Sequence, residues 1–549
     1  MKKFSPSAFF HGRFPIAIVA GLLLALAFPD FGIAGFAWVA PGLILAAALG
    51  KNGAEAWRIG YVAGLAHYLG SLYWLLNIPV KGFPILGWVA LAAFLALFPA
   101  TWVWLSLKIS SLRRQLPGES WPPILREISK LSWAHRMSWA LRCAAIWVAL
   151  EMILARIFGG FPWNFLGDSQ YRILPLIQFA SLTGVYGVSF LVAWTSVAFL
   201  CAAASILGEP NQRSPWMAEI ILPFTAVIAV FVYGFHQLSK PSEAAHQLKV
   251  ALVQPGIPQT LIWNPDNDLA RFQDLLQLSE QALTNQPDLI VWPEAALPGL
   301  PRYESQFGNP ISALARDHHT WMIIGADDAE ATPTATNYFN AAFLIDPDGK
   351  LANSYRKRGL VIFGEYIPLE RWLPFIKWFT PITGSYTAGD RAVQFELTDA
   401  SAKVPQKFHT SVLICFEDVF PHLARKSVEP DTDFLVNITN DGWFGEGAAQ
   451  WQQAAAATFR TVENGVPLIR CANTGITCWI DAKGRWAQKF TDKNGSVYGV
   501  GFMIATVPLP DQHSQTFYNR HGDWFGWACL ALAIVTVLAT WERRRPGGQ

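Results

Sequence analysis

Residues 410–418 have the sequence TSVLICFED, a β-branched and apolar run that ends in a cysteine and two acidic residues. A short apolar run of this kind predicts a strand buried inside a sheet. Cys415 would then lie at the carboxyl end of that strand, the edge at which open α/β sheets hold their ligands. Taken alone the position is a weak indication, because a cysteine in an apolar strand is usually an inert core residue.

Similar short apolar runs lie on both sides of this segment, between residues 247 and 510, separated by turn residues. The strands that they predict are 247–254, 288–292, 321–326, 338–346, 410–417, 433–439, 467–475, 476–481 and 499–507. Two amphipathic segments predict helices over 266–283 and 448–464. Apolar strands that alternate with helices indicate a single α/β domain whose sheet is covered by helices.

Two further reactive side chains follow predicted strands of this domain. Glu294 comes shortly after the strand DLIVW, and Lys357 lies in the basic loop YRKRGLVIFGEYIP. Each has a simple alternative, since the glutamate could cap a helix that begins at Ala295 and the lysine could be a solvated loop residue. Together with Cys415 they place a carboxylate, an ammonium and a thiol at strand ends, which predicts a nucleophilic active site.

The rest of the chain is apolar enough to cross a membrane repeatedly. Hydrophobic residues make up 52% of the sequence and charged residues only 15%, against roughly a quarter charged in ordinary soluble domains. A bilayer core of about 30 Å needs about 20 helical residues. Stretches near or above this length are 14–29, 31–50, 56–78, 83–107, 139–158, 175–206, 217–236 and 523–541. They predict a polytopic α-helical membrane domain with about eight transmembrane helices.

The loops between these stretches carry Lys and Arg unevenly, with most of them after the second, fourth and sixth stretches and in the C-terminal tail. Short cytoplasmic loops retain such residues, so both termini should be cytoplasmic. We therefore expect a transmembrane domain of seven helices at 1–239, an extracytoplasmic catalytic domain at 240–515, and a transmembrane helix with a basic tail at 516–549. The first stretch could instead be a cleaved signal peptide, although it runs almost directly into the second.

Net charge and cysteine content exclude several classes of function. A formal charge of +2 lacks the surplus of positive residues that nucleic-acid binding needs, so we expect no nucleic-acid partner. The 6 cysteines are too few for a disulfide framework and have no metal-ligand spacing. Cys471 and Cys478 form a close pair that could be a disulfide or two small buried strand residues. We expect no metal and no organic cofactor.

Two charged residues and one aromatic segment are further candidates for a role at the membrane. Glu151 and Arg156 lie in or near the fifth stretch, where a charge is either functional or else solvated or paired at the outer end. The aromatic segment Trp372–Phe379 predicts an interfacial lid that contacts lipid, with a packed core loop as the alternative.

Five segments give the chain a resemblance to the nitrilase or carbon-nitrogen hydrolase superfamily. They are LVQPGIPQTLIW (252–263), VWPEAALP (291–298), YRKRGLVIFGEYIPLE (355–370), CFED (415–418) and NDGWFG (440–445). Soluble members lack membrane spans, so the chain resembles the membrane branch, the apolipoprotein N-acyltransferases, over nearly its whole length. The resemblance implies that the extracytoplasmic domain is a nitrilase-like αββα sandwich.

The resemblance also implies roles for individual residues. Cys415 would be the nucleophile, Glu294 the general base and Lys357 the electrostatic stabiliser of an oxyanion. Supporting positions would be Glu365, Glu417, Trp263 and Phe416. Two residues depart from the family pattern, because Ile362 replaces a common proline before FGE and Phe416 replaces a common tyrosine after the cysteine. The second change removes a hydroxyl group.

By the same resemblance, a phospholipid would acylate Cys415 as a thioester. The N-terminal α-amine of a diacylglyceryl-prolipoprotein, freed by signal-peptide removal, would then take the acyl group as an amide. This is ping-pong covalent catalysis, placed at the periplasmic side of a bacterial cytoplasmic (inner) membrane and in contact with membrane lipid. Two alternatives differ in class: a membrane-tethered amidase or nitrilase that hydrolyses a C–N bond, and a non-enzymatic transport or scaffold protein.

Overall fold

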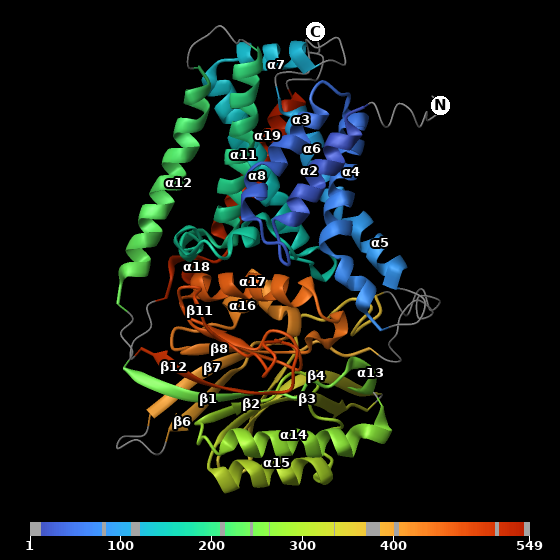
Figure 1. Cartoon of the computed structure of the whole chain (residues 1–549), viewed down its shortest axis with the longest axis vertical. Coiled ribbons are helices and arrows are strands. Elements are labelled where there is room, and N and C mark those ends of the chain that lie inside the picture. The colour runs from blue at the N-terminus through green and yellow to red at the C-terminus, as the bar shows by residue number, and fades with distance from the viewer. Residues whose placement is uncertain are drawn as a thin grey trace. The chain divides into compact units, whose positions relative to one another are not determined.

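The computed structural model describes residues 12–79, 84–110, 121–208, 215–241, 245–262, 264–333, 335–368, 385–399, 406–510 and 515–542. The chain divides into two compact units. The first, the helical unit, comprises Met1–Leu76, Ile85–Ser239 and Asp523–Gln549. The second, the sandwich unit, comprises Asn77–Pro84 and Lys240–Gly522. Both are drawn in Figure 1.

The helical unit is built mainly from apolar helices. Its longer helices are α2 (Phe14–Leu26), α3 (Ala40–Ala48), α4 (Gly53–Ser71), α5 (Pro84–Leu95), α6 (Leu97–Lys108), α7 (Trp121–Lys130), α8 (Trp133–Leu154), α11 (Val185–Gly208), α12 (Pro215–Ser239) and α19 (Trp524–Glu542). The shorter helices α9 (Leu174–Ile177) and α10 (Ala180–Thr183) precede α11. Each predicted apolar stretch therefore contains a helix.

These helices differ in whether they could cross a membrane alone. Among the described residues, 4 helices are long and apolar enough: Pro84–Lys108, Trp133–Leu154, Val185–Gly208 and Trp216–Ser239. Shorter apolar helices include Phe14–Leu26, Ala34–Ala48 and Trp524–Thr540. The prediction of a helical membrane domain agrees with this pattern, whereas the count of eight spans stays a prediction.

Small residues let the helices of this unit approach closely. A Cβ atom added to Gly21 of α2 would lie 2.1 Å from the carbonyl oxygen of Ala63 on α4. At Gly42 of α3, an added Cβ would lie 2.4 Å from the carbonyl oxygen of Ser196 on α11. Backbone contact of this kind is the usual basis of helix packing in membrane proteins.

The two charged residues of the fifth stretch have different surroundings inside the helical unit. Glu151 is buried in α8, where its Oε1 accepts hydrogen bonds from the Leu166 backbone N–H (2.8 Å) and the Trp147 indole N–H (2.9 Å). Arg156 forms an ion pair with Asp523. Arg156 therefore fits the paired alternative. Glu151 is neither solvated nor ion-paired among the described residues, since both of its donors are neutral and its Oε2 has no hydrogen-bond partner.

The sandwich unit contains two six-stranded sheets within its described residues. In sheet order, the first is β12 (Gly501–Leu509), β1 (His246–Gln254), β2 (Leu289–Val291), β3 (Trp321–Ala331), β4 (Thr336–Ile345) and β5 (Leu351–Arg356). The second is β11 (Trp486–Lys489), β10 (Cys478–Ile480), β9 (Leu468–Ala472), β8 (Phe434–Thr439), β7 (Gln406–Ile414) and β6 (Gln394–Asp399). Strands β1, β2 and β3 are parallel, as are β7, β8 and β9, and the outer strands are antiparallel.

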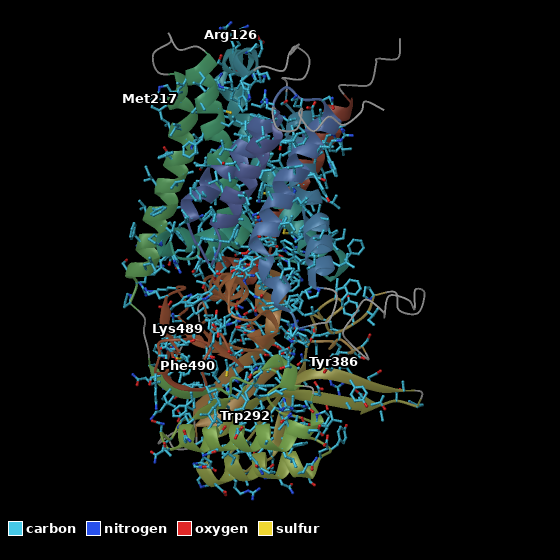
Figure 2. The ribbon with its side chains drawn as sticks, turned by 45° about the vertical axis from the view of Figure 1, so that its right-hand side comes forward. Arg126, Met217, Trp292, Tyr386, Lys489 and Phe490 are labelled. Carbon is cyan, nitrogen blue, oxygen red and sulfur yellow. The ribbon has the colours of Figure 1, made fainter. Side chains whose placement is uncertain are left out.

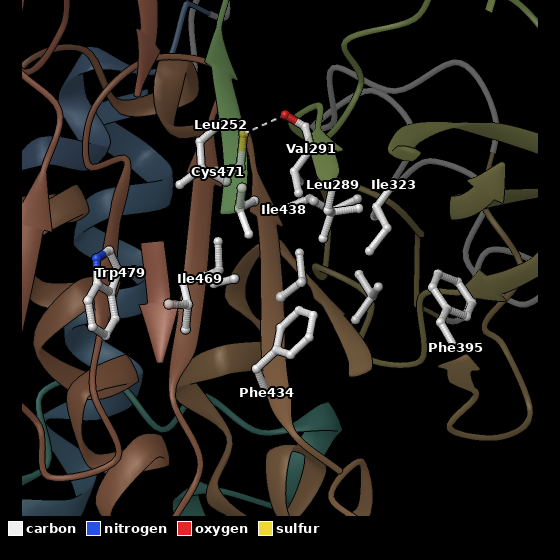
Figure 3. Close-up of a cluster of buried hydrophobic side chains, with 14 of the residues drawn as sticks. Leu252, Leu289, Val291, Ile323, Phe395, Phe434, Ile438, Ile469, Cys471 and Trp479 are labelled. Carbon is white, nitrogen blue, oxygen red and sulfur yellow. Dashed lines mark hydrogen bonds between the residues drawn. The ribbon is translucent and has the colours of Figure 1, made fainter. Parts of the chain in front are cut away.

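One apolar core fills the space between the sheets, and others lie under the helices. Alternate residues of both sheets form the central core, because successive side chains of a strand point to opposite faces. Cys471 of β9 bridges this core by donating from Sγ to the Val291 carbonyl oxygen of β2 (3.3 Å), as Figure 3 shows. Helices α14 (Asp268–Leu283) and α15 (Ser305–His318) cover the first sheet, and α16 (Pro421–Lys426) and α17 (Ala448–Asn464) the second (Figure 1). The layers therefore have the order αββα.

All nine predicted strands and both predicted helices of this unit are present, some of them shorter than predicted. Sequence patterns missed β5, β6, β11 and α15, and also the short helices α13 (Gln259–Ile262), α16 and α18 (Phe517–His521). The three strands lie at or near sheet edges, where polar side chains such as those of LANSYR replace a continuous apolar run. Helix α15 contains Gly308 and Pro310, which weaken a helical signal.

Several finer predictions are corrected or lie outside the described residues. The strand before Cys415 ends at Ile414, and Glu294 caps no helix, because a turn follows it. All 6 cysteines, which the described residues include, are free, so Cys471 and Cys478 are two small buried strand residues and not a disulfide. Outside the described residues lie Trp263, the segment Trp372–Phe379 and the basic tail at 543–545.

Candidate active site

Three strand ends of the sandwich unit place the predicted reactive side chains. Glu294 lies in the turn that follows β2, Lys357 directly follows β5, and Cys415 directly follows β7. All three are buried, with 5%, 1% and 9% of each residue exposed, respectively. Lys357 donates from Nζ to Glu294 Oε1 (3.1 Å), and the charges of both act on the Cys415 thiol. The structure therefore brings the predicted trio into one site.

Neighbouring groups fix the Glu294 carboxylate. The side-chain amide of Asn340, in β4, donates to Glu294 Oε1 (2.7 Å), and the backbone N–H of Asn440 donates to Oε2 (2.9 Å). Just before this turn, the indole N–H of Trp292 donates to Ser279 Oγ on α14 (2.9 Å), and Figure 2 labels Trp292 in the sandwich unit. Both carboxylate oxygens thus have defined partners and one orientation.

Lys357 lies between two carboxylates. Its Nζ donates to Glu365 Oε1 (2.7 Å) as well as to Glu294, and Asn340 also donates to Glu365 Oε1 (2.9 Å). Burial alone would lower the lysine pKa, but the charges of Glu294 and Glu365 outweigh it and hold the pKa well above its usual value. Lys357 is therefore a fixed ammonium at neutral pH, and its Nζ lies 5.7 Å from the centre of the Phe416 ring.

Cys415 has an unusual backbone conformation, with φ of 55° in the left-handed region that few residues other than glycine adopt. Its carbonyl oxygen accepts two side-chain amide hydrogen bonds, from Asn437 Nδ2 (2.9 Å) and Gln453 Nε2 (3.0 Å). The thiol is set on a sharp turn at the end of β7, and its surroundings hold that turn in place, as strained functional residues require.

The charge state of the Cys415 thiol follows from its surroundings. Burial raises its pKa well above the usual value, the negative charge of Glu294 raises it further, and the positive charge of Lys357 lowers it less. The sulfur is therefore a protonated thiol at neutral pH and needs a neighbouring base to become a nucleophile.

A ring of buried hydrogen bonds stabilises the turn at Cys415. Arg470 donates from Nη1 to Asp418 Oδ2 (2.7 Å) and to Asn437 Oδ1 (2.8 Å). Gln453 closes the ring, because it donates to both Asp418 Oδ1 (2.9 Å) and the Cys415 carbonyl oxygen. Removing any member would leave buried polar groups without partners.

Glu417 joins the turn of Cys415 to the loop of Lys357. Its Oε1 accepts from the backbone N–H groups of Arg358 (2.7 Å) and Gly359 (2.9 Å), and its Oε2 accepts from the N–H of Ile414 (2.8 Å). The Tyr355 hydroxyl lies 2.9 Å from both oxygens. With all these donors, Glu417 is a structural clamp and not a free base.

Of the other predicted supporting residues, Glu365 and Phe416 are described by the structure and Trp263 is not. Glu365 contacts Lys357 directly, and Phe416 packs edge-to-face on Phe420 with ring centres 5.0 Å apart. Sequence reasoning missed several partners of the site residues. Asn340, Asn437, Gln453 and Arg470 come from distant segments, and Asp418 lies in the same CFED segment as Cys415. A sequence signal exists for Asn340, Asn437 and Arg470, because each is a polar residue inside an apolar run, as in YFNAAFLI.

The described residues contain no group of three or more His, Cys, Asp or Glu side chains placed to hold a metal ion. The arrangement offers a thiol on a strained turn, a carboxylate within reach of a fixed ammonium, and apolar surroundings. These groups can perform covalent acyl transfer, in which a base takes the thiol proton and a cation stabilises the oxyanion.

Comparisons with known proteins agree with this chemistry. The family model described as Apolipoprotein N-acyltransferase N-terminal domain matches residues 20–198, and the model described as Carbon-nitrogen hydrolase matches residues 249–511. An Apolipoprotein N-acyltransferase of Geobacter metallireducens is 36% identical over 537 residues, which cover 96% of this chain and 95% of that protein. One of Rhizobium rhizogenes is 29% identical over 557 residues, with 96% and 95% covered.

Among solved structures, an amidase from Nesterenkonia sp. is similar with a TM-score of 0.35 and 15% identity, over 49% of this chain and 92% of that one. The relative from Geobacter extends over both units, the helical and the sandwich, and the two family models match them in turn. This chain belongs to the apolipoprotein N-acyltransferase family.

Proposed function

We propose that this chain is a membrane acyltransferase that moves a fatty acyl group from a phospholipid to a lipoprotein. The acceptor is the N-terminal α-amine of the diacylglyceryl-cysteine of an apolipoprotein, and the product is the triacylated form. The observation that carries the proposal is the buried contact of Lys357 with Glu294 and Glu365 beside Cys415. The names of its relatives from Geobacter metallireducens and Rhizobium rhizogenes support the choice of substrates.

In the first half-reaction, Glu294 takes the thiol proton of Cys415 while Sγ attacks the ester carbonyl carbon of the phospholipid. The Lys357 ammonium stabilises the oxyanion that forms. When the C–O bond breaks, the lysophospholipid leaves as an alcohol with the proton from Glu294. The acyl chain stays on Sγ as a thioester.

In the second half-reaction, the neutral α-amine of the acceptor attacks the thioester carbonyl. Glu294 takes a proton from the amine nitrogen, the C–S bond breaks, and the proton returns to Sγ. An amide and a free thiol result. The small exposed fractions of all three reactive residues favour transfer over hydrolysis, because a thioester in such a site meets little water.

The proposal includes placement at a membrane. The four long apolar helices support insertion of residues 1–239 in a bacterial cytoplasmic membrane, and the shorter apolar helix Trp524–Thr540 supports insertion of residues 516–549. The distribution of Lys and Arg supports a periplasmic position for residues 240–515 and cytoplasmic termini. A single cysteine placed at the exposed Thr284, in a chain otherwise free of cysteine, should react with an impermeant thiol reagent from the periplasmic side. Reaction only from the cytoplasmic side would reverse the orientation.

Intact-protein mass spectrometry tests the function. The chain incubated with phospholipid alone should gain one acyl group, which peptide mapping should place on Cys415. Addition of a diacylglyceryl-cysteine peptide should remove that adduct and give an N-acylated peptide. Cys529→Ala, a substitution in α19 of the helical unit, is the matched control and should still form the adduct. Release of free fatty acid without acylated peptide would instead identify a hydrolase.

A further inference from the structure

Asp327 is a carboxylate beside the candidate active site that the chemistry proposed above does not use. It lies in β3 directly opposite Asn340 of β4, whose side-chain amide donates to both Glu294 and Glu365. Opposite residues of an antiparallel pair share one face of the sheet. A Cβ atom added to Gly325, two residues before Asp327 on that face, would lie 2.8 Å from the Cα atom of Glu294. This face of β3 therefore meets the turn that carries Glu294.

A cavity of about 150 Å³ lies next to the same turn, and Asp327 lines it together with Ala295 and Leu297. The described lining contains one more carboxylate, that of Asp268 in α14, and one guanidinium, that of Arg271. These two residues pair with each other, because Arg271 donates from Nη2 to Asp268 Oδ1 (2.5 Å). Asp327 forms no ion pair within the described ranges of the chain. Its negative charge is therefore the one in this described lining that lacks a counterion.

Tyr386, which Figure 2 labels, orients the Asp327 carboxylate. Its hydroxyl lies 3.0 and 3.1 Å from the two carboxylate oxygens and donates to them, and its backbone N–H donates to the Glu365 carbonyl oxygen (2.8 Å). One hydroxyl proton leaves the carboxylate with lone pairs for a further donor. Burial raises the pKa of Asp327 to about 6, with a smaller contribution from the charges of Glu294 and Glu365, while the Tyr386 hydrogen bond lowers it. At pH 7 Asp327 is therefore a carboxylate that accepts a proton more readily than an ordinary aspartate does.

We propose that Asp327 binds the α-ammonium group of the acyl acceptor and takes its first proton, before the neutral amine moves on to Glu294. This inference rests on the proposed function. An α-amine with a pKa of about 8 is mostly ammonium at pH 7, and an ammonium nitrogen has no lone pair with which to attack a thioester.

The protons of this step balance. One N–H bond of the ammonium breaks as an O–H bond forms on Asp327, which leaves a neutral amine and a carboxylic acid. Glu294 takes the second proton while the amine nitrogen attacks the thioester carbonyl, as described above. Asp327 then releases its proton to water and is ready for the next acceptor.

The test separates the two half-reactions. The acyl-enzyme is formed from phosphatidylglycerol, a donor whose headgroup has no amine, and is then mixed with a diacylglyceryl-cysteine peptide while mass spectrometry follows the adduct on Cys415. Asp327→Asn should form the adduct at an unchanged rate but transfer it about 10-fold more slowly at pH 7, because only about a tenth of the amine is then neutral. At pH 9 the amine is mostly neutral, and the difference should shrink to within about twofold. Asp317→Asn, at an exposed aspartate on α15, is the matched control and should change neither rate.

Tyr386→Phe gives a second readout, the pH dependence of transfer. In the natural chain, transfer should slow as the pH falls below about 6, where Asp327 becomes protonated. The variant should move this fall to higher pH, because Asp327 loses the hydrogen bond that lowers its pKa. An unmoved pH profile would contradict the role of Asp327. Losses of equal size at pH 7 and pH 9 in Asp327→Asn would mean a structural role and overturn the proposal. Unchanged transfer at pH 7, or slower adduct formation with unchanged transfer, would overturn it as well.

A binding measurement does not depend on acyl transfer. A lipid-free peptide with an N-terminal S-glyceryl-cysteine is titrated calorimetrically into the full chain in detergent, and its N-acetylated form is the comparison. The free-amine peptide should bind the natural chain at least about 10-fold more tightly than the N-acetylated peptide does, and Asp327→Asn should remove this difference. Equal affinities of the two peptides for the natural chain would overturn the proposal. If the natural chain forms no acyl adduct, the proposed function fails, while an Asp327-dependent preference for the free amine would still support the ammonium site.

Discussion

Replacement of Glu417 by glutamine tests whether this residue is a clamp or a reacting group. Glu417 is completely buried, and its two oxygens accept from three backbone N–H groups and the Tyr355 hydroxyl. Glutamine has almost the same shape but only one acceptor oxygen. Its amide nitrogen must therefore point at the N–H of Ile414 or at those of Arg358 and Gly359.

The loss of unfolding free energy in Glu417→Gln follows from the number of hydrogen bonds that glutamine cannot accept. In the less costly orientation, the Ile414 N–H loses its acceptor, which costs about 1–3 kcal/mol for a buried donor. The remaining bonds lose the assistance of the negative charge, so a total of about 2–4 kcal/mol in unfolding free energy is expected. The loop of Lys357 would also loosen relative to Cys415, and a displacement of about 1 Å can lower a rate about 100-fold.

Urea unfolding and the rate of Cys415 acylation by phospholipid, measured on the same protein, check both effects. Glu396→Gln is the matched control, because Glu396 lies on the edge strand β6, where it pairs with Lys407 at the surface. That control should change the unfolding free energy by no more than about 0.5 kcal/mol. If Glu417→Gln leaves stability and acylation unchanged, the clamp does not exist. Lost acylation with unchanged stability would make Glu417 a reacting group.

Three further predictions concern the reactive trio. Cys415→Ser should form no acyl-enzyme detectable by mass spectrometry, since a hydroxyl is a much weaker acid than a thiol, and normal turnover would refute the assignment. Lys357→Met should lower the rate of Cys415 acylation about 10² to 10³-fold, because the oxyanion loses its cation. It should also lower the unfolding free energy by about 3–5 kcal/mol, because Glu294 and Glu365 would then face each other without a cation. Adding Glu365→Gln should recover the unfolding free energy measured in urea but not the acylation rate. Because its pKa is raised, Cys415 should react with iodoacetamide more slowly than free cysteine at pH 7 and gain reactivity as the pH rises above the usual thiol range. A rate at pH 7 equal to that of free cysteine would contradict this.

Local sequence patterns were sufficient for the elements that bury continuous apolar surface. The run TSVLI predicts β7, and its reactive cysteine lies at the strand end because the apolar run stops there. Helix α17 begins and ends at the predicted residues. The apolar pattern does not predict edge strands such as β11, since such a strand pairs with a neighbouring strand on one side only and keeps most of its side chains in water.

The sequence by itself determined that apolar stretches come first, that an α/β domain follows, and that Cys415 and Glu294 come at strand ends. It placed Lys357 in a basic loop, and only the structure shows that this loop follows β5. The sequence could not determine which polar groups hold these residues, because those partners lie far along the chain. Lys357 meets Glu294 across 63 positions, and Arg358 meets Glu417 across 59. Strand pairing within the first sheet brings Lys357 to Glu294, and the packing of the two sheets brings Arg358 to Glu417. Burial then sets the charge states, since hydrogen bonds and desolvation depend on neighbours in space and not on neighbours in sequence.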